Sequence, residues 1–184
     1  LALIAPAIAD GATQPTIDST LVMYEANGAR QFEQPLGVAI DAGHDEIVVA
    51  NTGLGRIEFF GRDGRPHGFF VHRITDALGV ERDGLPRHVA ATADGRILVT
   101  DTWATYVDVC DFRGHSLARI TLPAPDDRID GGNGPGAIAV GYDGRVLVAS
   151  RGKTGRVHVF SPEGERLHTW GAPGTAPGQL ASIT

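Results

Sequence analysis

The stretch that decides the fold reads PLGVAID at residues 35–41, EIVVANTG at 46–53 and GRIEFFGRDG at 55–64. The pattern returns twice, opening with PRHVAAT at 86–92 and with PGAIAV at 135–140. The three opening prolines are separated by 51 and 49 residues, and the glycines that close the copies by 50 each, at Gly64, Gly114 and Gly164. A period of about 50 residues kept over three copies indicates a propeller or a solenoid.

Each copy has the pattern of β-strands. At 57–59, 107–109 and 157–159, two apolar residues flank one polar residue, which is the period-two alternation typical of strands. Asp-Gly pairs at 63–64, 94–95 and 143–144 predict tight turns, because glycine accepts a positive φ at little cost. Each copy therefore predicts four short strands, here named a to d. No stretch favours a helix of ten residues.

The repeat also organises the rest of the chain. We expect an all-β segment over residues 19–184 that follows a short leader. Residues 1–9, LALIAPAIA, have the apolar character and small-x-small ending of a signal-peptide remnant, and they predict a periplasmic or secreted protein. An apolar N-terminal strand is the alternative. The predicted divisions are a linker at 10–18, a partial blade at 19–34, full blades at 35–84, 85–134 and 135–173, and a partial blade at 174–184.

These motifs resemble the NHL repeat, on the residues quoted above and over roughly residues 19–184. The resemblance implies an NHL-type β-propeller segment of four-stranded antiparallel blades, part of a ring that usually has six blades around a central channel. The copies depart from the pattern where Tyr106 replaces Arg56 and Arg156, and where Ser150 takes the place of Asn51. Because propellers carry many functions, the resemblance alone does not name one.

The length bears on assembly. The chain has 184 residues, whereas six repeats of this size would need about 300. Each repeat buries its core only against its neighbours, so an unclosed segment leaves apolar faces at its two ends. We therefore expect this chain to be poorly soluble as a monomer and to self-associate, or to pair with another half-ring.

Composition excludes several function classes. The chain has 16 Lys and Arg against 22 Asp and Glu, a net charge of −6, which argues against a nucleic-acid partner. A single cysteine excludes an intramolecular disulfide framework and a cysteine-rich zinc site. No apolar run approaches the roughly 20 residues of a membrane span.

Recognition is predicted on one face of the blades. Antiparallel order brings the d-to-a and b-to-c loops to one face, here called the loop face, and the compact a-to-b and c-to-d turns to the other, the turn face. The d-to-a loops at 73–85 and 123–134 are long and irregular, and the b-to-c loops at 51–55, 101–105 and 150–155 differ between copies. Such variation on a rigid scaffold favours binding. Simple tolerance of insertions explains it equally well.

The residues predicted to bind a partner lie in or beside these loops: Arg87, His88, Trp103, Arg151 and Lys153, with Asn51 and Asp101 as polar rim groups. Trp103 is the sharpest candidate, because the sister copies carry Gly53 and Gly152 in the same loop. Exposed tryptophan and arginine are typical anchors of binding sites. Packing of Trp103 over a neighbouring blade is the alternative.

These residues predict a non-enzymatic, exported propeller that binds a protein or a glycan, with no catalytic residue, no metal ligand and no cofactor. The alternative is a metal-dependent lactonase or lyase. The resemblance implies that such enzymes hold Ca²⁺ or Zn²⁺ at the channel, with lyase histidines beside the blade-opening prolines. Those positions hold Leu36, Arg87 and Gly136 here, and His88 follows one position later. A catalytic zinc needs about three protein ligands, so the others would have to lie in blades outside this chain.

Other polar residues receive structural predictions. Cys110 is expected to be a small buried residue between blades. Arg56 and Arg156 recur at one repeat position and are expected to pack within their blades. The acidic stretch 126–131 lacks the ligand spacing of a calcium loop. Five histidines are expected at the surface, away from the channel: His67, His72, His115, His158 and His168.

Overall fold

The structure is a computed structural model that describes residues 23, 25–26, 28, 30–76, 78–123, 134–151 and 155–180. The predicted signal-peptide remnant and linker, residues 1–18, lie outside this part. Among the described residues, strands dominate and the only helix is a single 3-10 turn, Thr52–Leu54. In the same part of the chain, no helix is long and apolar enough to cross a membrane.

Three four-stranded antiparallel sheets follow one another along the chain, and the predicted blade architecture is confirmed. Within each sheet the strands pair in sequence order, as the assignment a to d requires. Blade 1 consists of β3 (Pro35–Asp41), β4 (Glu46–Asn51), β5 (Arg56–Gly61) and β6 (Pro66–Val71). Blade 2 consists of β9 (Pro86–Ala91), β10 (Ile97–Asp101), β11 (Tyr106–Cys110) and β12 (Ser116–Thr121). Blade 3 consists of β13 (Pro135–Val140), β14 (Val146–Ser150), β15 (Val157–Phe160) and β16 (Arg166–Trp170).

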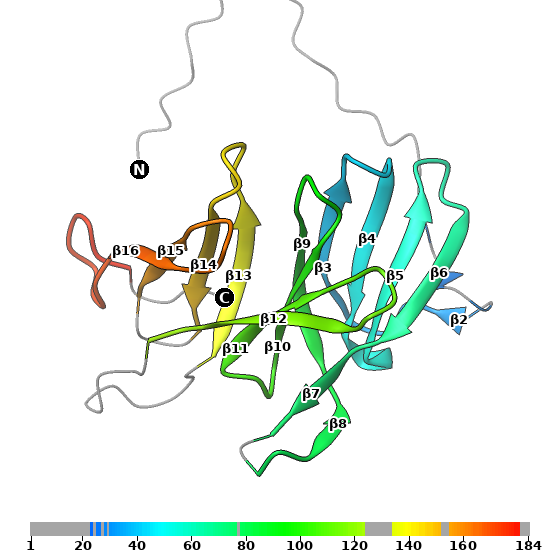
Figure 1. The fold of residues 1–184 in the computed structure, drawn as a ribbon, viewed down its shortest axis with the longest axis horizontal. Coiled ribbons are helices and arrows are strands. Elements are labelled where there is room, and N and C mark those ends of the chain that lie inside the picture. Colours follow the sequence, from blue (N-terminus) through cyan, green and yellow to red (C-terminus); the bar gives the residue numbers. More distant parts are fainter. Residues whose placement is uncertain are drawn as a thin grey trace, which may run out of the picture.

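The a strands are the innermost strands. Figure 1 shows β9 between β3 and β13, and β9 contacts both of them. Each opening proline pairs with the last residue of its b strand, as Pro86 does with Asp101. The starts of the a strands and the ends of the b strands therefore meet on the loop face, which points downward in Figure 1.

The core consists of two inter-blade layers. One layer joins blade 1, through residues such as Val48 and Phe59, to Ile97 and Val99 of blade 2. The other joins Leu98 of blade 2 to blade 3. Because successive side chains of a strand point to opposite sides, Ile97 and Leu98 enter different layers. Strands β10 and β11 of blade 2 are therefore buried on both faces.

The predicted Asp-Gly turns are confirmed on the turn face. Gly64, Gly95 and Gly144 have φ of 79°, 81° and 77°, in the region that favours glycine. The carboxylates of Asp63 and Asp143 accept backbone N–H groups two residues further on, at 3.0 and 3.1 Å. Such Asx turns complete the hydrogen bonding of a short reversal.

The loop at 73–85 is not irregular, and that prediction was wrong. It forms a two-stranded hairpin, β7 (Arg73–Thr75) with β8 (Glu81–Asp83), which protrudes below the blades in Figure 1. A second small pair, β1 (Glu25–Ala26) with β2 (Arg30–Gln31), precedes blade 1 within the predicted partial blade. Of the loop 123–134, residues 124–133 lie outside the described part.

A close approach between inner strands gives a first prediction. A Cβ atom added at Gly37 on β3 would lie 2.7 Å from His88 Cα and 2.8 Å from the Arg87 carbonyl oxygen on β9. Both are backbone atoms, so Gly37→Ala must push blade 1 from blade 2. We expect a loss of about 1–3 kcal/mol in unfolding free energy, measured by urea denaturation. Gly43→Ala is the control, because its nearest atoms lie at 3.3 and 3.4 Å; equal losses in both variants would contradict the close approach.

Candidate functional site

The hairpin β7–β8 is anchored on blade 2. Ile74 is buried against Ala104 and Tyr106. The Thr75 backbone N–H donates to the Tyr106 hydroxyl at 3.1 Å. Arg119 of β12 donates to the Thr75 hydroxyl at 2.7 Å, and its guanidinium carbon lies 4.4 Å from the centre of the Tyr106 ring. These contacts fix the hairpin as a wall on the loop face.

The tip of the hairpin is held by Asp76. Its carboxylate accepts the backbone N–H groups of Leu78 and Val80, each at 2.9 Å, and pairs with Arg82. The backbone bond from Val80 is the largest cause that lowers the pKa of Asp76 below its ordinary value, with the bonds from Leu78 and Arg82 acting in the same direction. Asp76 therefore stays ionised and orders the turn around itself.

Trp103 faces this hairpin from the loop between β10 and β11. Its side chain is 63% exposed, so it is not packed beneath a neighbouring blade. Its backbone N–H donates to Asp101 Oδ1 at 2.8 Å. A hollow of about 300 Å³ lies between the two segments and is lined by Ile74, Asp76, Arg82 and Trp103. We call these four residues the hairpin groove.

Two predicted rim residues are not on the rim. Asn51 and Asp101 are both 0% exposed, so the prediction that they form polar rim groups was wrong. Asn51 accepts the Glu33 backbone N–H at 2.9 Å and donates to Glu58 Oε1 at 2.7 Å. Each of the two residues is the last of its b strand, and its side chain points into the layer between blades. Polar groups buried there must be hydrogen-bonded.

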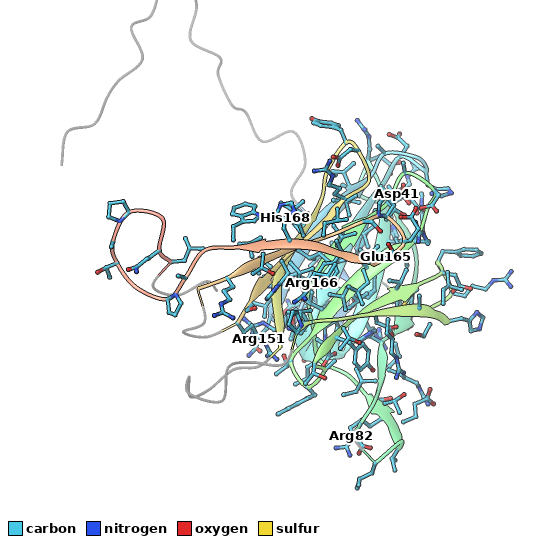
Figure 2. The ribbon with its side chains drawn as sticks, turned by 60° about the vertical axis from the view of Figure 1, so that its left-hand side comes forward. Asp41, Arg82, Arg151, Glu165, Arg166 and His168 are labelled. Carbon is cyan, nitrogen blue, oxygen red and sulfur yellow. The ribbon has the colours of Figure 1, made fainter. Side chains whose placement is uncertain are left out.

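The predicted basic residues form a second group, near the inner strands. Burial is the largest cause that lowers the pKa of Arg151, and the positive charge of Arg87 acts in the same direction. Burial, followed by the Arg87 charge, also lowers the pKa of His88, whose imidazole is therefore neutral at pH 7. Figure 2 shows Arg82 on the hairpin and Arg151 well apart from it. Lys153 lies outside the described residues.

His72 was predicted to lie at the surface, and this was wrong. His72 follows directly after β6 and is 1% exposed. Its ring lies between two carboxylates of blade 2. Its Nδ1 lies 3.0 Å from Asp101 Oδ2, and its Nε2 lies 3.5 Å from Asp108 Oδ2. Burial is the largest influence and opposes the imidazolium charge, but the hydrogen bond to Asp101 and the negative charges of Asp101 and Asp108 outweigh it and raise the pKa of His72.

Cys110 belongs to the same cluster. It is buried, as predicted, and it borders the layer between blades 1 and 2. Burial, with the Asp108 carboxylate, raises the pKa of its thiol above the ordinary value. Ligand atoms of His72, Asp108 and Cys110 all lie within 4.8 Å of one another. Ser116 donates to Asp108 Oδ1 at 2.5 Å and fixes that carboxylate.

His158 was also wrongly predicted to lie at the surface. It is 4% exposed on β15, with Nε2 at 2.8 Å from Ser150 Oγ and Nδ1 at 2.9 Å from Thr169 Oγ1. Burial, followed by the charges of Arg156 and Arg166, lowers the pKa of His158. The other three histidines, His67, His115 and His168, are exposed as predicted.

One signal in the sequence pointed to these buried groups. The repeat aligns three polar residues at the ends of the b strands, and three more in the middle of the c strands: Asn51, Asp101 and Ser150, then Glu58, Asp108 and His158. A polar residue that recurs at one repeat position is consistent with a side chain that is buried and hydrogen-bonded to a partner, as well as with one that is exposed to solvent. Arg56 shows the predicted packing within a blade, with its guanidinium 4.0 Å from the Phe69 ring centre.

Comparisons with solved structures show the propeller fold. The virginiamycin B lyase of Staphylococcus aureus aligns over 79% of this chain and 43% of its own, with a TM-score of 0.55 at 16% identity. Hydrazine synthase of Kuenenia stuttgartiensis aligns over 84% and 39%, with a TM-score of 0.53 at 19% identity. The Dos1 propeller aligns over 83% and 38%, with a TM-score of 0.53 at 16% identity.

These likenesses establish the fold and not the activity. This chain spans less than half the length of each of those three proteins. No protein-family model matches the sequence, and no curated protein matches it. The chain is a segment of a β-propeller, and the NHL assignment stays a prediction.

The anchoring of the hairpin gives a second prediction. Tyr106→Phe removes the hydroxyl that accepts the Thr75 N–H and leaves that donor without its partner. We expect the docked hairpin to lose about 1 kcal/mol. Hydrogen exchange at the Thr75 amide should then be roughly fivefold faster. Tyr142→Phe is the matched control, since Tyr142 is fully exposed in a turn; unchanged exchange in Tyr106→Phe would show that the bond does not hold the hairpin.

Proposed function

We propose that this propeller segment is a binding scaffold that recognises a partner protein through the hairpin groove. The observation that carries the proposal is Trp103, a large aromatic side chain that is 63% exposed beside a hollow of about 300 Å³. Burial of an exposed tryptophan is among the largest single contributions to protein binding.

The groove combines the contacts that protein interfaces use. Trp103 and Ile74 supply apolar area, while Arg82 and Asp76 supply charged groups at the edge. Interfaces are enriched in tryptophan and arginine, and their rims are polar. A groove already ordered by Asp76 and Tyr106 also loses little conformational freedom on binding. Sugars also stack on tryptophan, so a glycan ligand is an outcome of the test below.

Export is part of the proposal and is supported by the sequence alone. Residues 1–9 resemble the end of a signal peptide. Amino-terminal sequencing of the native protein from a periplasmic or culture fraction should begin near Asp10. Cytoplasmic protein that keeps residues 1–9 would contradict this part of the proposal.

The third prediction tests the groove directly. The chain is screened against a phage-displayed random peptide library and a glycan array, and the affinities of selected ligands are measured. We expect peptides to be selected, and Trp103→Ala to weaken them at least about tenfold, because it removes the aromatic anchor.

Phe112→Ala is the matched control, because Phe112 is 65% exposed on the turn face. Its affinities should equal those of the unchanged chain. If Trp103→Ala, alone or combined with Arg87→Ala, left every affinity unchanged, the groove would not be the site. Ligands found on the glycan array alone would replace the protein partner with a carbohydrate.

A second candidate function rests on His88. Its Nε2 is buried and has no hydrogen-bond partner among the described residues. The residue lies on the inner strand β9, and its neutral imidazole has the form that binds metals. The propeller fold does accommodate enzymes, and virginiamycin B lyase is one of them. A lactonase or lyase with a channel metal would use His88 as one ligand and take the others from further blades.

The fourth prediction separates the two functions. Metal analysis of a protein that contains the remaining blades should give Ca²⁺ or Zn²⁺ that depends on His88 only if the protein is such an enzyme. In that case His88→Ala lowers the metal content and the rate of lactone hydrolysis together, while Trp103→Ala changes neither. A channel without metal and a protein without hydrolysis would exclude the enzyme.

A further inference from the structure

In blades 1 and 3, two buried polar side chains of the same blade form a hydrogen bond with each other. At the end of each b strand one side chain reaches a side chain in the middle of the c strand. In blade 1, Asn51 Nδ2 donates to Glu58 Oε1 at 2.7 Å. In blade 3, Ser150 Oγ and His158 Nε2 lie 2.8 Å apart. Each pair combines a donor with an acceptor, so it is satisfied without help from another blade.

Blade 2 cannot do this. The same two positions hold Asp101 and Asp108, and ionised carboxylates only accept hydrogen bonds. His72, from the chain that leaves blade 1, lies between them instead. Blade 2 differs at a third position too, because Cys110 stands where the sister blades bury Phe60 and Phe160. His72, Asp108 and Cys110, three side chains of types that bind metals, therefore meet at the one described four-stranded blade whose b-strand and c-strand polar residues do not pair with each other.

The two ring nitrogens of His72 have different contacts. Nδ1 lies 3.0 Å from Asp101 Oδ2, an ordinary hydrogen bond. Nε2 lies 3.5 Å from Asp108 Oδ2 and has no hydrogen-bond partner among the described residues, although His72 is 1% exposed. Two ligand atoms about 2.0–2.1 Å from a tetrahedral zinc ion lie roughly 3.3 Å apart, so a separation of 3.5 Å leaves room for one ion between these two atoms.

We propose that His72 Nε2, the Asp108 carboxylate and Cys110 Sγ form a buried zinc site between blades 1 and 2. The ligand atoms lie within 4.8 Å of one another, and one nitrogen, one oxygen and one sulfur is a set that Zn²⁺ accepts. Water fills the fourth position.

The surroundings have the form that metal sites require. Metal-binding histidines commonly donate their second ring N–H to a carboxylate, and His72 Nδ1 has Asp101 in that place. Ser116 orients the Asp108 carboxylate in the same way. Binding releases the thiol proton of Cys110, and any proton on His72 Nε2, to the solvent. The ion is then bound by three side chains that come from two blades, so it crosslinks blade 1 to blade 2.

The fifth prediction concerns metal content. Because the three ligands are buried, the ion must enter during folding. The 184-residue chain is refolded from guanidinium, under a reductant, with Zn²⁺ or with Co²⁺, and is freed of unbound metal by gel filtration. We expect one ion per chain by mass spectrometry, and for Co²⁺ a near-ultraviolet thiolate-to-cobalt charge-transfer band. The guanidinium midpoint of the unchanged chain should rise with the Zn²⁺ concentration.

Three variants make the test specific. Cys110→Ser should abolish the band and the stoichiometric metal, and Asp101→Asn should weaken metal affinity about 10–100-fold while the band remains. His88→Ala is the control and should leave both unchanged, which separates this site from a channel metal. The proposal is overturned if the unchanged chain refolds without bound metal and without a shift in midpoint. It is equally overturned if Cys110→Ser retains the metal. The midpoint of the unchanged chain decides the matter even if a variant fails to fold.

Discussion

The packing of one blade against the next is the constraint on which the rest of the structure depends. Each blade is a sheet four strands wide, and its apolar side chains are covered only where a neighbouring blade lies over them. The inner strands approach so closely that Gly37 meets the backbone of β9. Both faces of β10 and β11 thereby become interior, with Ile97 in one layer and Leu98 in the other. Water is excluded from positions that an isolated sheet would leave exposed.

This exclusion governs the polar side chains. A polar group between two blades must find a partner inside the protein, because leaving it without one costs about 1–3 kcal/mol. The three blades meet this demand differently: by an amide and a carboxylate, by a hydroxyl and an imidazole, and in blade 2 by a histidine from the preceding blade. Asp101 has a second structural role, since its other carboxylate oxygen accepts the backbone N–H of Trp103 in the loop between β10 and β11. The interior and the loop face are therefore connected at one carboxylate.

The sequence predicted the repeating part of the fold and missed what the repeats do to one another. The 50-residue period, the opening prolines and the Asp-Gly turns placed twelve strands in three blades, because these are local signals. The burial of Asn51, Asp101, His72 and His158 was missed, since alternation does not reveal whether a second blade covers the polar side of a strand. The hairpin β7–β8 was missed because Ile74 is the one residue of its strands that is buried. Trp103 was placed correctly as an exposed residue, because it interrupts a repeat position that is otherwise glycine.

His72 also bears on how such a chain can be rearranged by gene duplication or circular permutation. Blades 1 and 3 each hold both members of their buried polar pair, so the two members stay together when either blade is copied or moved. Blade 2 does not, because its two carboxylates share a histidine that is encoded with blade 1. Separating those two blades would leave the buried carboxylates of blade 2 without the histidine that lies between them. Two buried like charges without a partner are strongly destabilising. Blades 1 and 2 would thus have to be duplicated or moved together, as one unit of about a hundred residues. That is twice the length of the repeat that is visible in the sequence.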